Sequence, residues 1–453
     1  MLRLFDTATA SLRPLDAGNG PLGMYICGPT VYGPPHVGHG RFCLVYDVLR
    51  RYLEWSGTSV LHVSNITDID DKIIKVAADS GRSWQEVAGE NVAAWFEAMD
   101  AMGIARPHEI PRATDYVEQM VELVGHLLER GAAYETADAV YFSAAFVSDY
   151  GLLAHQAVDS LRAGARVEPN ENKRAPVDFA LWKKAKPGEP RWPSPFGYGR
   201  PGWHTECVVM SLELLGEGFA LHGAGEDLKF PHNENERAQA EALGRRSARH
   251  WVHNGMLISG EEKMSKSLGN TAGLLDLVGS GDPRAYRLVV LQAHYREQMK
   301  LDEARLSEAG RALQGLDALA RRLEDAKRES SAPGMGVSKE ALSRFSSQMD
   351  DDLGTPSAIA GLFEAARASN SALDHRDAAA GLALGGAVLD AFSALGLVPS
   401  AHVEVSEGAL HLARQRDAAR AGRDFALADR LREELAGLGY RVEDTPGGTR
   451  LLR

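Results

Sequence analysis

The apolar positions divide the chain into a region where short strands alternate with helices and a region that is mainly helical. Short apolar runs at residues 24–26, 59–63, 219–222 and 251–258 end at polar or glycine-bearing loops, as buried strands do. After the first run, apolar residues recur at helical spacing from residue 38 until Gly57 ends the helix. Strand, helix and strand in this order predict a parallel sheet whose strand ends hold ligand.

Outside these strands the pattern is mostly helical. Ser83 and Glu86 fit a capping box that begins a helix over residues 84–102. Further helices are predicted over residues 115–130, 211–215, 284–294 and 301–326, with a hairpin over 133–143. A polar linker at 327–334 is followed by predicted helices at 338–349, continuing past Pro356, and at 378–395, 409–423 and 425–438.

Length, charge and cysteine content narrow the class of protein. A chain of 453 residues exceeds one hydrophobic core, so two to four domains are expected. No apolar run reaches the ~18 residues of a membrane helix and the first residues lack signal-peptide organisation, which predicts a cytoplasmic protein that does not enter membranes. The net charge of −12 argues against coating nucleic acid by bulk electrostatics, although a local basic face stays possible. The three widely spaced cysteines, Cys27, Cys43 and Cys207, argue against a disulfide framework, and Cys43 is expected to pack within a helix.

Two loops carry residues suited to phosphate chemistry. Residues 36–39 read His-Val-Gly-His at the start of the first helix, where unpaired N–H groups attract phosphate. Gly38 lets a phosphate chain or a flat ring approach the backbone, and His36 and His39 can donate hydrogen bonds to oxygens that gain charge. A second loop, EEKMSKSLGN at 261–270, offers Lys263 and Lys266 as mobile cations for a pentavalent phosphate.

Together the HVGH and KMSKS sequences resemble the paired signatures of class I aminoacyl-tRNA synthetases. The surrounding sequence resembles the cysteinyl-tRNA synthetase family in particular, over almost the whole chain. The similar segments are CGPTVYGPPHVGHGR at 27–41, NITDIDDKIIK at 65–75, SPFGYGRPGWHTEC at 194–207, FPHNENERAQAEA at 230–242 and FALADRLREELAGLGYRVEDTPGGTR at 425–450. Val37 and Asn233 depart from the family pattern, which often has isoleucine and a second histidine there.

The resemblance implies an α/β fold, with a doubly wound parallel (Rossmann-type) catalytic core interrupted by a connective domain and followed by C-terminal all-α domains. Composition alone describes the interrupting region only as a small α+β module. The expected divisions are 1–80 and 193–275 for the two halves of the catalytic domain, 81–192 for the connective region, 276–330 for a helical stem-contact region, 331–398 for a helical bundle and 399–453 for an anticodon-side helical domain.

Cys27, Cys207, His232 and Glu236 are the candidate metal ligands. By spacing alone the signal is weak, although His232 and Glu236 are four apart and would share a helix face. Both cysteines are expected at strand ends that a doubly wound fold brings together. The resemblance implies that the four residues hold one Zn²⁺ per chain. Shape alone separates cysteine from serine or alanine by only ~1–3 kcal/mol, whereas zinc binds a thiolate strongly. A purely structural zinc is the alternative, because four protein ligands fill a tetrahedral site. Proximity to HVGH favours recognition of the substrate sulfur by the zinc instead. Glu236 is the ligand most able to give up its position on the metal.

The resemblance also assigns the other site residues. It places Gly28, Thr67, Trp203, His222 and Asp227 at the amino-acid substrate, with Asp227 holding its amine. His36, His39, Lys263 and Lys266 are the expected catalytic residues, and His36, Gly38, His39 and Lys266 the expected ATP contacts, with Mg²⁺ accompanying ATP. No covalent enzyme intermediate is expected.

The implied activity is activation of L-cysteine with ATP and its transfer to tRNA(Cys) by a monomeric enzyme. The arginines at 414, 416, 420, 423, 430 and 432 would then contact tRNA, although such spacing usually marks a solvated helix face. One alternative is a cysteine ligase that acylates a small amine, such as the amino-sugar acceptor of mycothiol biosynthesis; residues 335–453, which follow the linker, favour tRNA instead. The other alternative, a non-catalytic RNA-binding paralogue, would be expected to have lost one of the motifs.

Overall fold

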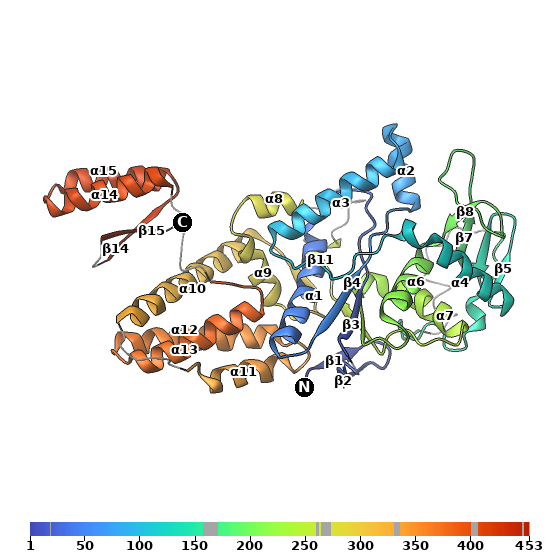
Figure 1. The fold of residues 1–453 in the computed structure, drawn as a ribbon, viewed down its shortest axis with the longest axis horizontal. Helices are drawn as coiled ribbons and strands as arrows, with labels where there is room; N and C mark the ends of the chain where they lie inside the picture. Colours follow the sequence, from blue (N-terminus) through green and yellow to red (C-terminus); the bar gives the residue numbers. More distant parts are fainter. Residues whose placement is uncertain are drawn as a thin grey trace.

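A four-stranded parallel sheet lies at the centre of the molecule. The computed structural model describes residues 1–18, 20–156, 171–259, 262–263, 273–329, 336–399, 406–445 and 448–452. Across the sheet the strands follow the order β10 (His250–Asn254), β9 (Leu221–Gly225), β3 (Leu22–Ile26) and β4 (Val60–Ser64). Figure 1 shows β3 and β4 side by side near the middle of the molecule. All three pairings are parallel, with Met24 opposite both Leu221 and His62. The predicted doubly wound parallel core is therefore confirmed.

The two halves of this sheet are wound in opposite directions from the centre. Strand β3 leads through α1 (Val37–Trp55) to β4, and β9 leads through α7 (Glu234–Ala242) to β10. Because β3 and β9 are neighbours, the strand order reverses between them, and the loops that follow them part at this point. Such a switch point is where open α/β sheets bind ligands.

Alternation along β3 assigns its side chains to two different layers. Met24 and Ile26 belong to the core that contains α1, whereas Tyr25 and Cys27 pack with Cys207 of α6 (Trp203–Leu215). This is the period-two pattern of a strand covered by helices on both faces. The sheet therefore separates an α1 side from an α6 side.

Helix α1 forms where the sequence predicted it. His36 precedes it in an extended conformation, with φ −109° and ψ 168°, and shares a capping box with His39. Leu44, Val48 and Leu49 are fully or almost fully buried along its inner face. The predicted capping box is also found, since Ser83 and Glu86 cap α3 (Trp84–Ala101), and the helix predicted over 284–294 forms as α9 (Pro283–Leu291), which Asp282 caps.

Several local predictions were wrong, each for a physical reason. Helix α6 begins at Trp203, not at Ser211, because residues 205–212 are all buried and show no polar face to set a helical period. The second half-sheet accordingly begins at β9, and Cys207 lies within a helix and not at a strand end. The strand predicted over 251–258 is two strands, since the chain leaves the sheet at Gly255, where a Cβ would lie 2.4 Å from the Glu297 carbonyl oxygen.

Helix α2 (Asp71–Ser80) follows β4 and was not predicted. The Asp70 carboxylate accepts a hydrogen bond from the Lys72 backbone N–H at its first turn. Gly81, with φ +66°, ends the helix in the left-handed conformation that favours glycine. Only Ile73 and Ala77 of this helix are buried, so its apolar stripe is narrow.

An inserted unit carries its own antiparallel sheet. The strand order is β5 (Ala133–Glu135), β6 (Ala139–Phe142), β7 (Phe179–Lys184) and β8 (Gly199–Pro201), so the predicted hairpin forms as β5 and β6. These strands share a core with α4 (Val117–Glu129) and with the α6 side of the central domain. Helix α3 instead packs in the core that contains α1.

The remaining elements flank these units. They are β1 (Arg3–Asp6), β2 (Ser11–Pro14), β11 (Leu257–Ser259), β12 (Glu262–Lys263) and β13 (Met299–Lys300), with short helical turns at Ala113–Tyr116, Ala144–Phe146, Glu226–Leu228 and Lys229–Asn233. Helices follow as α8 (Leu274–Gly279), α10 (Glu303–Glu329), α11 (Lys339–Met349), α12 (Thr355–Asp374) and α13 (Ala378–Ala394).

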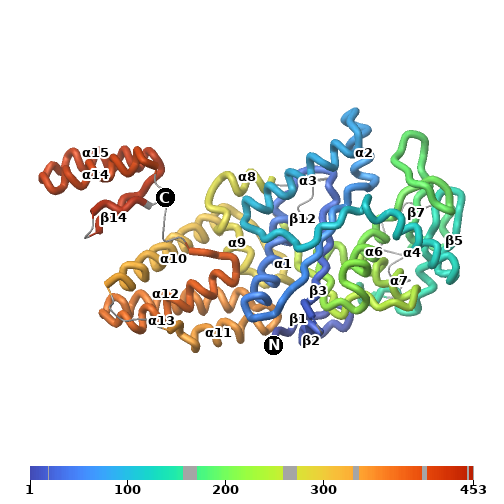
Figure 2. The backbone as a smooth tube through the Cα atoms, viewed as in Figure 1, coloured from blue at the N-terminus to red at the C-terminus, as the bar shows by residue number. Residues whose placement is uncertain are grey.

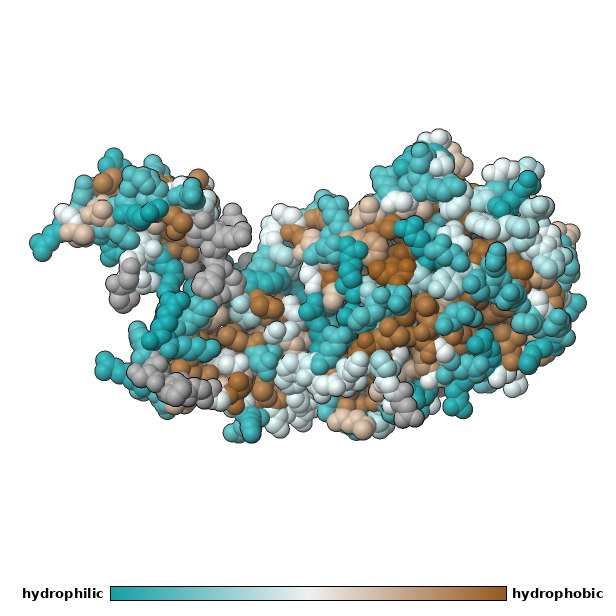
Figure 3. Space-filling model, in the orientation of Figure 1, coloured by the Kyte–Doolittle hydropathy of each residue, from teal (hydrophilic) through white to brown (hydrophobic). Residues whose placement is uncertain are grey.

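The final unit lies next to α10 (Figure 2), with Arg450 3.0 Å from Asp325 of that helix, and it is predominantly hydrophilic on the face seen in Figure 3. It contains the predicted helical pair, α14 (Glu407–Ala421) and α15 (Phe425–Gly437). It also contains an antiparallel hairpin, β14 (Arg441–Thr445) and β15 (Gly448–Leu452). This unit therefore contains strands as well as helices, whereas only helices were expected. Val442 and Leu451 of the hairpin close a small core against both helices.

A buried ion pair joins the parallel-sheet domain to the helical region. Asp47 on α1 accepts hydrogen bonds from Arg287 on α9 at 2.5 Å, from Arg51 at 2.8 Å and from the Ala105 backbone N–H at 2.9 Å. Arg287 also donates to the Leu395 carbonyl oxygen just after α13. Although burial opposes ionisation, the two arginines hold the pKa of Asp47 below its ordinary value.

Asp47→Asn is therefore expected to destabilise the protein by about 3–5 kcal/mol at pH 7, because it leaves the Arg287 charge buried without a counter-charge. Since the folded pKa of Asp47 is lowered, its contribution is present above the unfolded value of ~3.9 and is lost as pH falls through the folded value. Urea unfolding at pH 7 measures the first effect, and the same measurement at a series of pH values below ~3.9 measures the second. The control is Asp100→Asn, which removes an exposed partner of Arg106 and should cost at most ~1 kcal/mol. Equal costs for the two variants would contradict this account.

Candidate metal centre and substrate site

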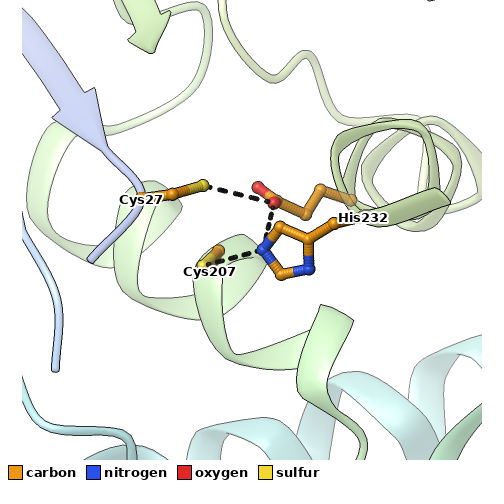
Figure 4. Close-up of side chains that lie close together, drawn as sticks. Cys27, Cys207 and His232 are labelled. Carbon is orange, nitrogen blue, oxygen red and sulfur yellow. Dashed lines mark hydrogen bonds and ion pairs between the residues drawn. The ribbon is translucent and has the colours of Figure 1, made fainter. Parts of the chain in front are cut away.

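The four predicted metal ligands converge at the switch point of the sheet. Cys27 directly follows β3, Cys207 lies on α6, His232 lies in the turn before α7 and Glu236 in the first turn of α7 (Figure 4). All four are buried, and one donor atom from each lies within 4.8 Å of the others. Cys27 thus meets ligands that are 180 or more positions away in the sequence, because the two halves of the fold are neighbours.

The donor set and its spacing suit a zinc ion. Ligands bound at ~2.0–2.3 Å in a tetrahedron lie roughly 3.3–3.8 Å from one another. The Cys207 Sγ atom is 3.6 Å from His232 Nε2, and Cys27 Sγ is 3.8 Å from Glu236 Oε1. The His232 Nε2 to Glu236 Oε1 distance is shorter, 2.9 Å, because these two atoms form an ion pair. Two sulfurs, one imidazole nitrogen and one carboxylate oxygen are ligands that zinc takes in proteins.

The charges of the cluster are strongly coupled. Burial opposes a charge on His232, but Glu236 and Cys207 outweigh it and raise the pKa of His232 to about 10. Burial also opposes ionisation of Glu236, yet His222 and His232 hold its pKa well below the ordinary value. Burial raises the pKa of the Cys27 thiol, and a hydrogen bond with Cys27 together with burial raises that of Cys207. The pocket therefore favours a positive centre beside Glu236.

Neighbouring rings and amides fix the orientation of the ligands. His204 and His232 share a hydrogen bond between their Nδ1 atoms at 2.8 Å, and the Trp203 ring stacks on His232 at 4.2 Å. His222 Nε2 donates to Glu236 Oε2 at 2.7 Å. Asn233 donates to Glu236 Oε1 at 2.9 Å and to the Cys27 sulfur at 3.5 Å. Second partners of this kind orient metal ligands and raise metal affinity.

A hydrogen-bonded chain ties the strand-end loops to α6. The Gly28 N–H donates to Asn65 Oδ1 at 2.7 Å, and Asn65 Nδ2 donates to Thr67 Oγ1 at 3.2 Å. Thr67 Oγ1 in turn donates to Glu206 Oε2 at 2.6 Å. A Cβ at Gly28 would lie 1.5 Å from the Asn65 carbonyl oxygen, so only glycine fits there. The chain holds Thr67 beside the segment that carries Cys207.

Sequence reasoning missed His204, Asn65 and Glu206 as parts of the site. His204 and Glu206 stand beside Trp203 and Cys207, within a segment already singled out, but buried polar side chains on an all-buried helix carry no periodic signal. Asn65 lies two residues before Thr67 on the same loop. Asp227, predicted near the substrate amine, is exposed in the short helical turn after β9.

The HVGH residues lie at the N-terminus of α1. The rings of His36 and His39 stack at 3.7 Å, and the His36 backbone N–H donates to His39 Nδ1 at 3.2 Å. A neutral His39 ring therefore carries its proton on Nε2. Gly38 lies next to the His36 ring, which a Cβ would approach to 2.9 Å. The backbone of Lys263 pairs with Ile258, and Lys266 lies outside the described residues.

Comparison with known proteins decides the family. The family model "tRNA synthetases class I (C) catalytic domain" matches residues 15–311, and the DALR domain model matches residues 344–398. The chain is 42% identical to the cysteine–tRNA ligase of Geobacillus thermodenitrificans, covering 100% of this chain and 99% of that protein. The chain belongs to the cysteinyl-tRNA synthetase family. The corresponding enzyme of Thermotoga maritima is 43% identical, with 95% of each chain covered.

Solved structures of other synthetases share the fold of this cysteinyl-tRNA synthetase family member. A Mycobacterium tuberculosis methionyl-tRNA synthetase bound by methionyl-adenylate superposes with a TM-score of 0.64, covering 90% of this chain and 96% of that chain at 16% identity. An Agrobacterium radiobacter leucyl-tRNA synthetase in a ternary complex gives a TM-score of 0.63 at 12% identity, with 84% of each chain covered. Among the described residues, no helix combines the length and apolar character that a membrane span requires.

Proposed function

We propose that the protein activates L-cysteine with ATP and transfers the cysteinyl group to tRNA(Cys). The observation that carries this proposal is the buried Cys27, Cys207, His232 and Glu236 cluster at the end of β3, the strand that leads into the HVGH helix, in a chain of the cysteinyl-tRNA synthetase family. The cluster suits a thiol, and the helix N-terminus suits phosphate. The two required substrates would thus meet at one switch point of the sheet.

Zinc would select the substrate by its sulfur. The four cluster residues would hold one Zn²⁺, which supplies a Lewis acid that binds a thiolate and discriminates against the hydroxyl of serine. Cys27 and Cys207 contribute sulfur, while His204 and His222 hold His232 and Glu236 in place. Of the four ligands, Glu236 is the one most able to give up its position on the metal to the substrate sulfur. The competing assignment is a zinc with a purely structural role.

The substrate backbone would be held by groups around this cluster. Gly28, Thr67, Trp203, His222 and Asp227 are the proposed contacts to the amino acid, with Asp227 holding the amine. Asn65 and Glu206 support this arrangement through their hydrogen bonds to the Gly28 N–H and to Thr67. His222 would make this contact through its Nδ1 atom, which is buried without a hydrogen-bond partner among the described residues, because its Nε2 atom is engaged by Glu236.

Adenylate formation would use the positive end of α1. The backbone N–H groups at its first turn and the imidazoles of His36 and His39 would stabilise charge on the ATP phosphates. Lys263 and Lys266 are proposed to add two cations, and Mg²⁺ to accompany ATP. The amino-acid carboxylate attacks the α-phosphorus atom and pyrophosphate leaves, so no enzyme nucleophile is needed.

Transfer to tRNA would involve the predicted connective and C-terminal regions, whose ranges stay predictions.

Within the final unit the arginines divide into two groups. Arg416 is buried and bonds to Asp444 and Thr449, so its role is structural. Arg423, Arg430 and Arg432 are exposed and are the better candidates for phosphate contacts. A monomeric state and a cytoplasmic location also stay predictions.

The direct test has two steps. ATP–pyrophosphate exchange should depend on cysteine and be at least ~100-fold less efficient with serine, since zinc recognition exceeds what shape supplies. Cysteine should then be transferred to a tRNA(Cys) transcript and not to an amino-sugar acceptor. If the protein catalyses exchange and acylates the amino-sugar but does not charge tRNA, it is the small-amine ligase and this proposal is wrong. If it does not catalyse exchange, a non-catalytic RNA-binding protein is favoured.

Glu206→Ala is expected to raise the KM for cysteine about tenfold, because Thr67 loses its 2.6 Å hydrogen-bond partner and with it a fixed rotamer. The turnover number should change less than KM. Steady-state pyrophosphate exchange measures both parameters. Glu213→Ala, at an exposed position of the same helix, is the matched control and should leave KM unchanged. An unchanged KM in the Glu206 variant would contradict the positioning role of this chain.

A further inference from the structure

Residues 294–300, which lie between α9 and α10, hold the strand that leads into KMSKS. Their strand β13 pairs in parallel with β11, with Met299 opposite Leu257. Strand β12, which contains Lys263, pairs with the other edge of β11. The Met299 backbone N–H also donates to the Met256 carbonyl oxygen at 3.1 Å. The position of the KMSKS strand therefore depends on the 294–300 segment.

Arg41, two residues after HVGH, binds the same segment from α1. It is buried, with 1% of its surface exposed. Its guanidinium donates to the carbonyl oxygen of Met256 at 2.6 Å and to that of Glu297. Within the described residues its hydrogen bonds go to backbone carbonyl oxygens and not to a carboxylate. Because the guanidinium is a rigid planar fork, the place of these carbonyls fixes the place of Arg41. Both motifs proposed to bind ATP are thus attached to the 294–300 segment.

Asp352, in the turn between α11 and α12, also binds this segment. It is buried, and its Oδ1 atom accepts a hydrogen bond from the Tyr295 hydroxyl at 2.8 Å. Its Oδ2 atom accepts from Arg296 Nε at 2.8 Å. The Nε2 atom of His294 lies 3.0 Å from the Asp352 carbonyl oxygen. One residue of the turn therefore contacts three consecutive residues of the 294–300 segment, and a charge-assisted hydrogen bond is among these contacts.

The turn that carries Asp352 has an unusual backbone conformation. Asp352 and Leu353 have φ values of +57° and +51°, in the left-handed region that residues other than glycine rarely adopt. Consecutive residues persist there only where neighbouring contacts fix them. Here the Asp352 N–H donates to the Arg3 carbonyl oxygen of β1 at 2.9 Å, and Asp352 Oδ1 accepts from the Phe5 N–H at 2.9 Å. The turn therefore holds the carboxylate in one place between β1 and the 294–300 segment.

We propose that Asp352 is a positioning residue for adenylate formation. Through Tyr295 and Arg296 it fixes the 294–300 segment. This segment in turn sets the positions of Arg41 and of the strand that leads into KMSKS. The inference rests on the adenylate-forming function proposed above. Asp352 belongs neither to the four-residue cluster nor to the predicted amino-acid contacts, so its loss should affect ATP and not cysteine or zinc.

The test compares full-length Asp352→Asn with the wild type in cysteine-dependent pyrophosphate exchange. Asparagine tolerates a positive φ and keeps one oxygen for Tyr295 and Phe5, but its NH₂ group cannot accept from Arg296. The KM for ATP is expected to rise about tenfold, since a misplacement of ~1 Å can cost up to ~10²-fold. The KM for cysteine and the zinc affinity should not change. A merely structural role would lower the amount of active protein, which lowers the apparent turnover number but leaves both KM values unchanged.

The matched control is Asp351→Asn, because Asp351 is exposed and pairs with the Arg3 side chain at 2.7 Å; both KM values should stay at the wild-type level. If thermal unfolding shows that Asp352→Asn does not fold, Tyr295→Phe decides. This variant removes only the hydroxyl that donates to Asp352, and the KM for ATP should rise about threefold.

The outcomes separate this inference from the proposed function. With an active wild type, an unchanged KM for ATP in the deciding variant, or a KM for cysteine that rises as much, would overturn the positioning role of Asp352 alone. A wild type that catalyses no cysteine-dependent exchange would overturn the proposed function and this inference with it.

Discussion

Replacing Cys207 by serine is expected to weaken zinc binding by on the order of 10²–10³-fold and to reduce cysteine-dependent pyrophosphate exchange by at least a similar factor. Structural zinc sites with four ligands bind with ~10–16 kcal/mol in total, so one ligand accounts for about 2.5–4 kcal/mol. Cys207 lies on α6 with its sulfur 3.6 Å from His232 Nε2, and both side chains are buried. A hydroxyl at this position is a poorer zinc ligand than a thiolate. Chelator competition measures the affinity, and isotope exchange measures the activity.

The matched control for this experiment is Cys43→Ser. Cys43 lies on α1, half-buried, and takes no part in the four-residue cluster. This variant should keep full zinc stoichiometry and cysteine-dependent exchange. A Cys207→Ser protein that keeps both wild-type zinc affinity and wild-type exchange would show that this sulfur is not a ligand.

His39→Ala is expected to lower the turnover number of adenylate formation by about 10²–10³-fold while leaving the KM for cysteine nearly unchanged. Removing one donor that stabilises charge in a transition state costs this much in other enzymes. The His39 Nδ1 atom accepts from the His36 backbone N–H, which places the ring proton on Nε2 at the N-terminal end of α1. Pyrophosphate exchange at varied ATP and cysteine concentrations separates the two parameters.

A control for His39 tests whether histidine loss in general has this effect. His375, exposed where α12 ends, can be replaced by alanine with no expected change in exchange. Thermal unfolding of both variants checks that α1, which His39 helps to cap, is still formed. A His39→Ala variant with raised KM for cysteine and an intact turnover number would contradict a role in phosphate chemistry.

The parts of the fold that could be predicted are those where one side of an element is polar. Helices α1 and α3 combine an apolar stripe with capping residues, so both their existence and their first turns followed from the sequence. The start of helix α6 could not be predicted, because eight consecutive residues of it are buried between the sheet and the inserted unit. The break between β10 and β11 depends on a close approach of Gly255 to the Glu297 carbonyl, a contact between segments distant in sequence.

The candidate site was predictable only in part, for a related reason. Spacing alone does not reveal that Cys27 and Cys207 meet, since their approach depends on β3 and α6 packing across one face of the sheet. Segment resemblance supplied the ligands. It did not supply Asn65 and Glu206, whose roles follow from hydrogen bonds to Gly28 and Thr67 that only the folded chain brings together.

X-ray absorption at the zinc edge tests the central claim most directly. The full-length protein is loaded with one equivalent of zinc and measured alone, with cysteine and with serine. Cys27 and Cys207 supply two sulfurs, so cysteine should raise the number of sulfur ligands at ~2.3 Å from two to three, while serine should leave it at two. A count that stays at two with saturating cysteine would contradict thiol recognition by the metal and leave zinc a structural role.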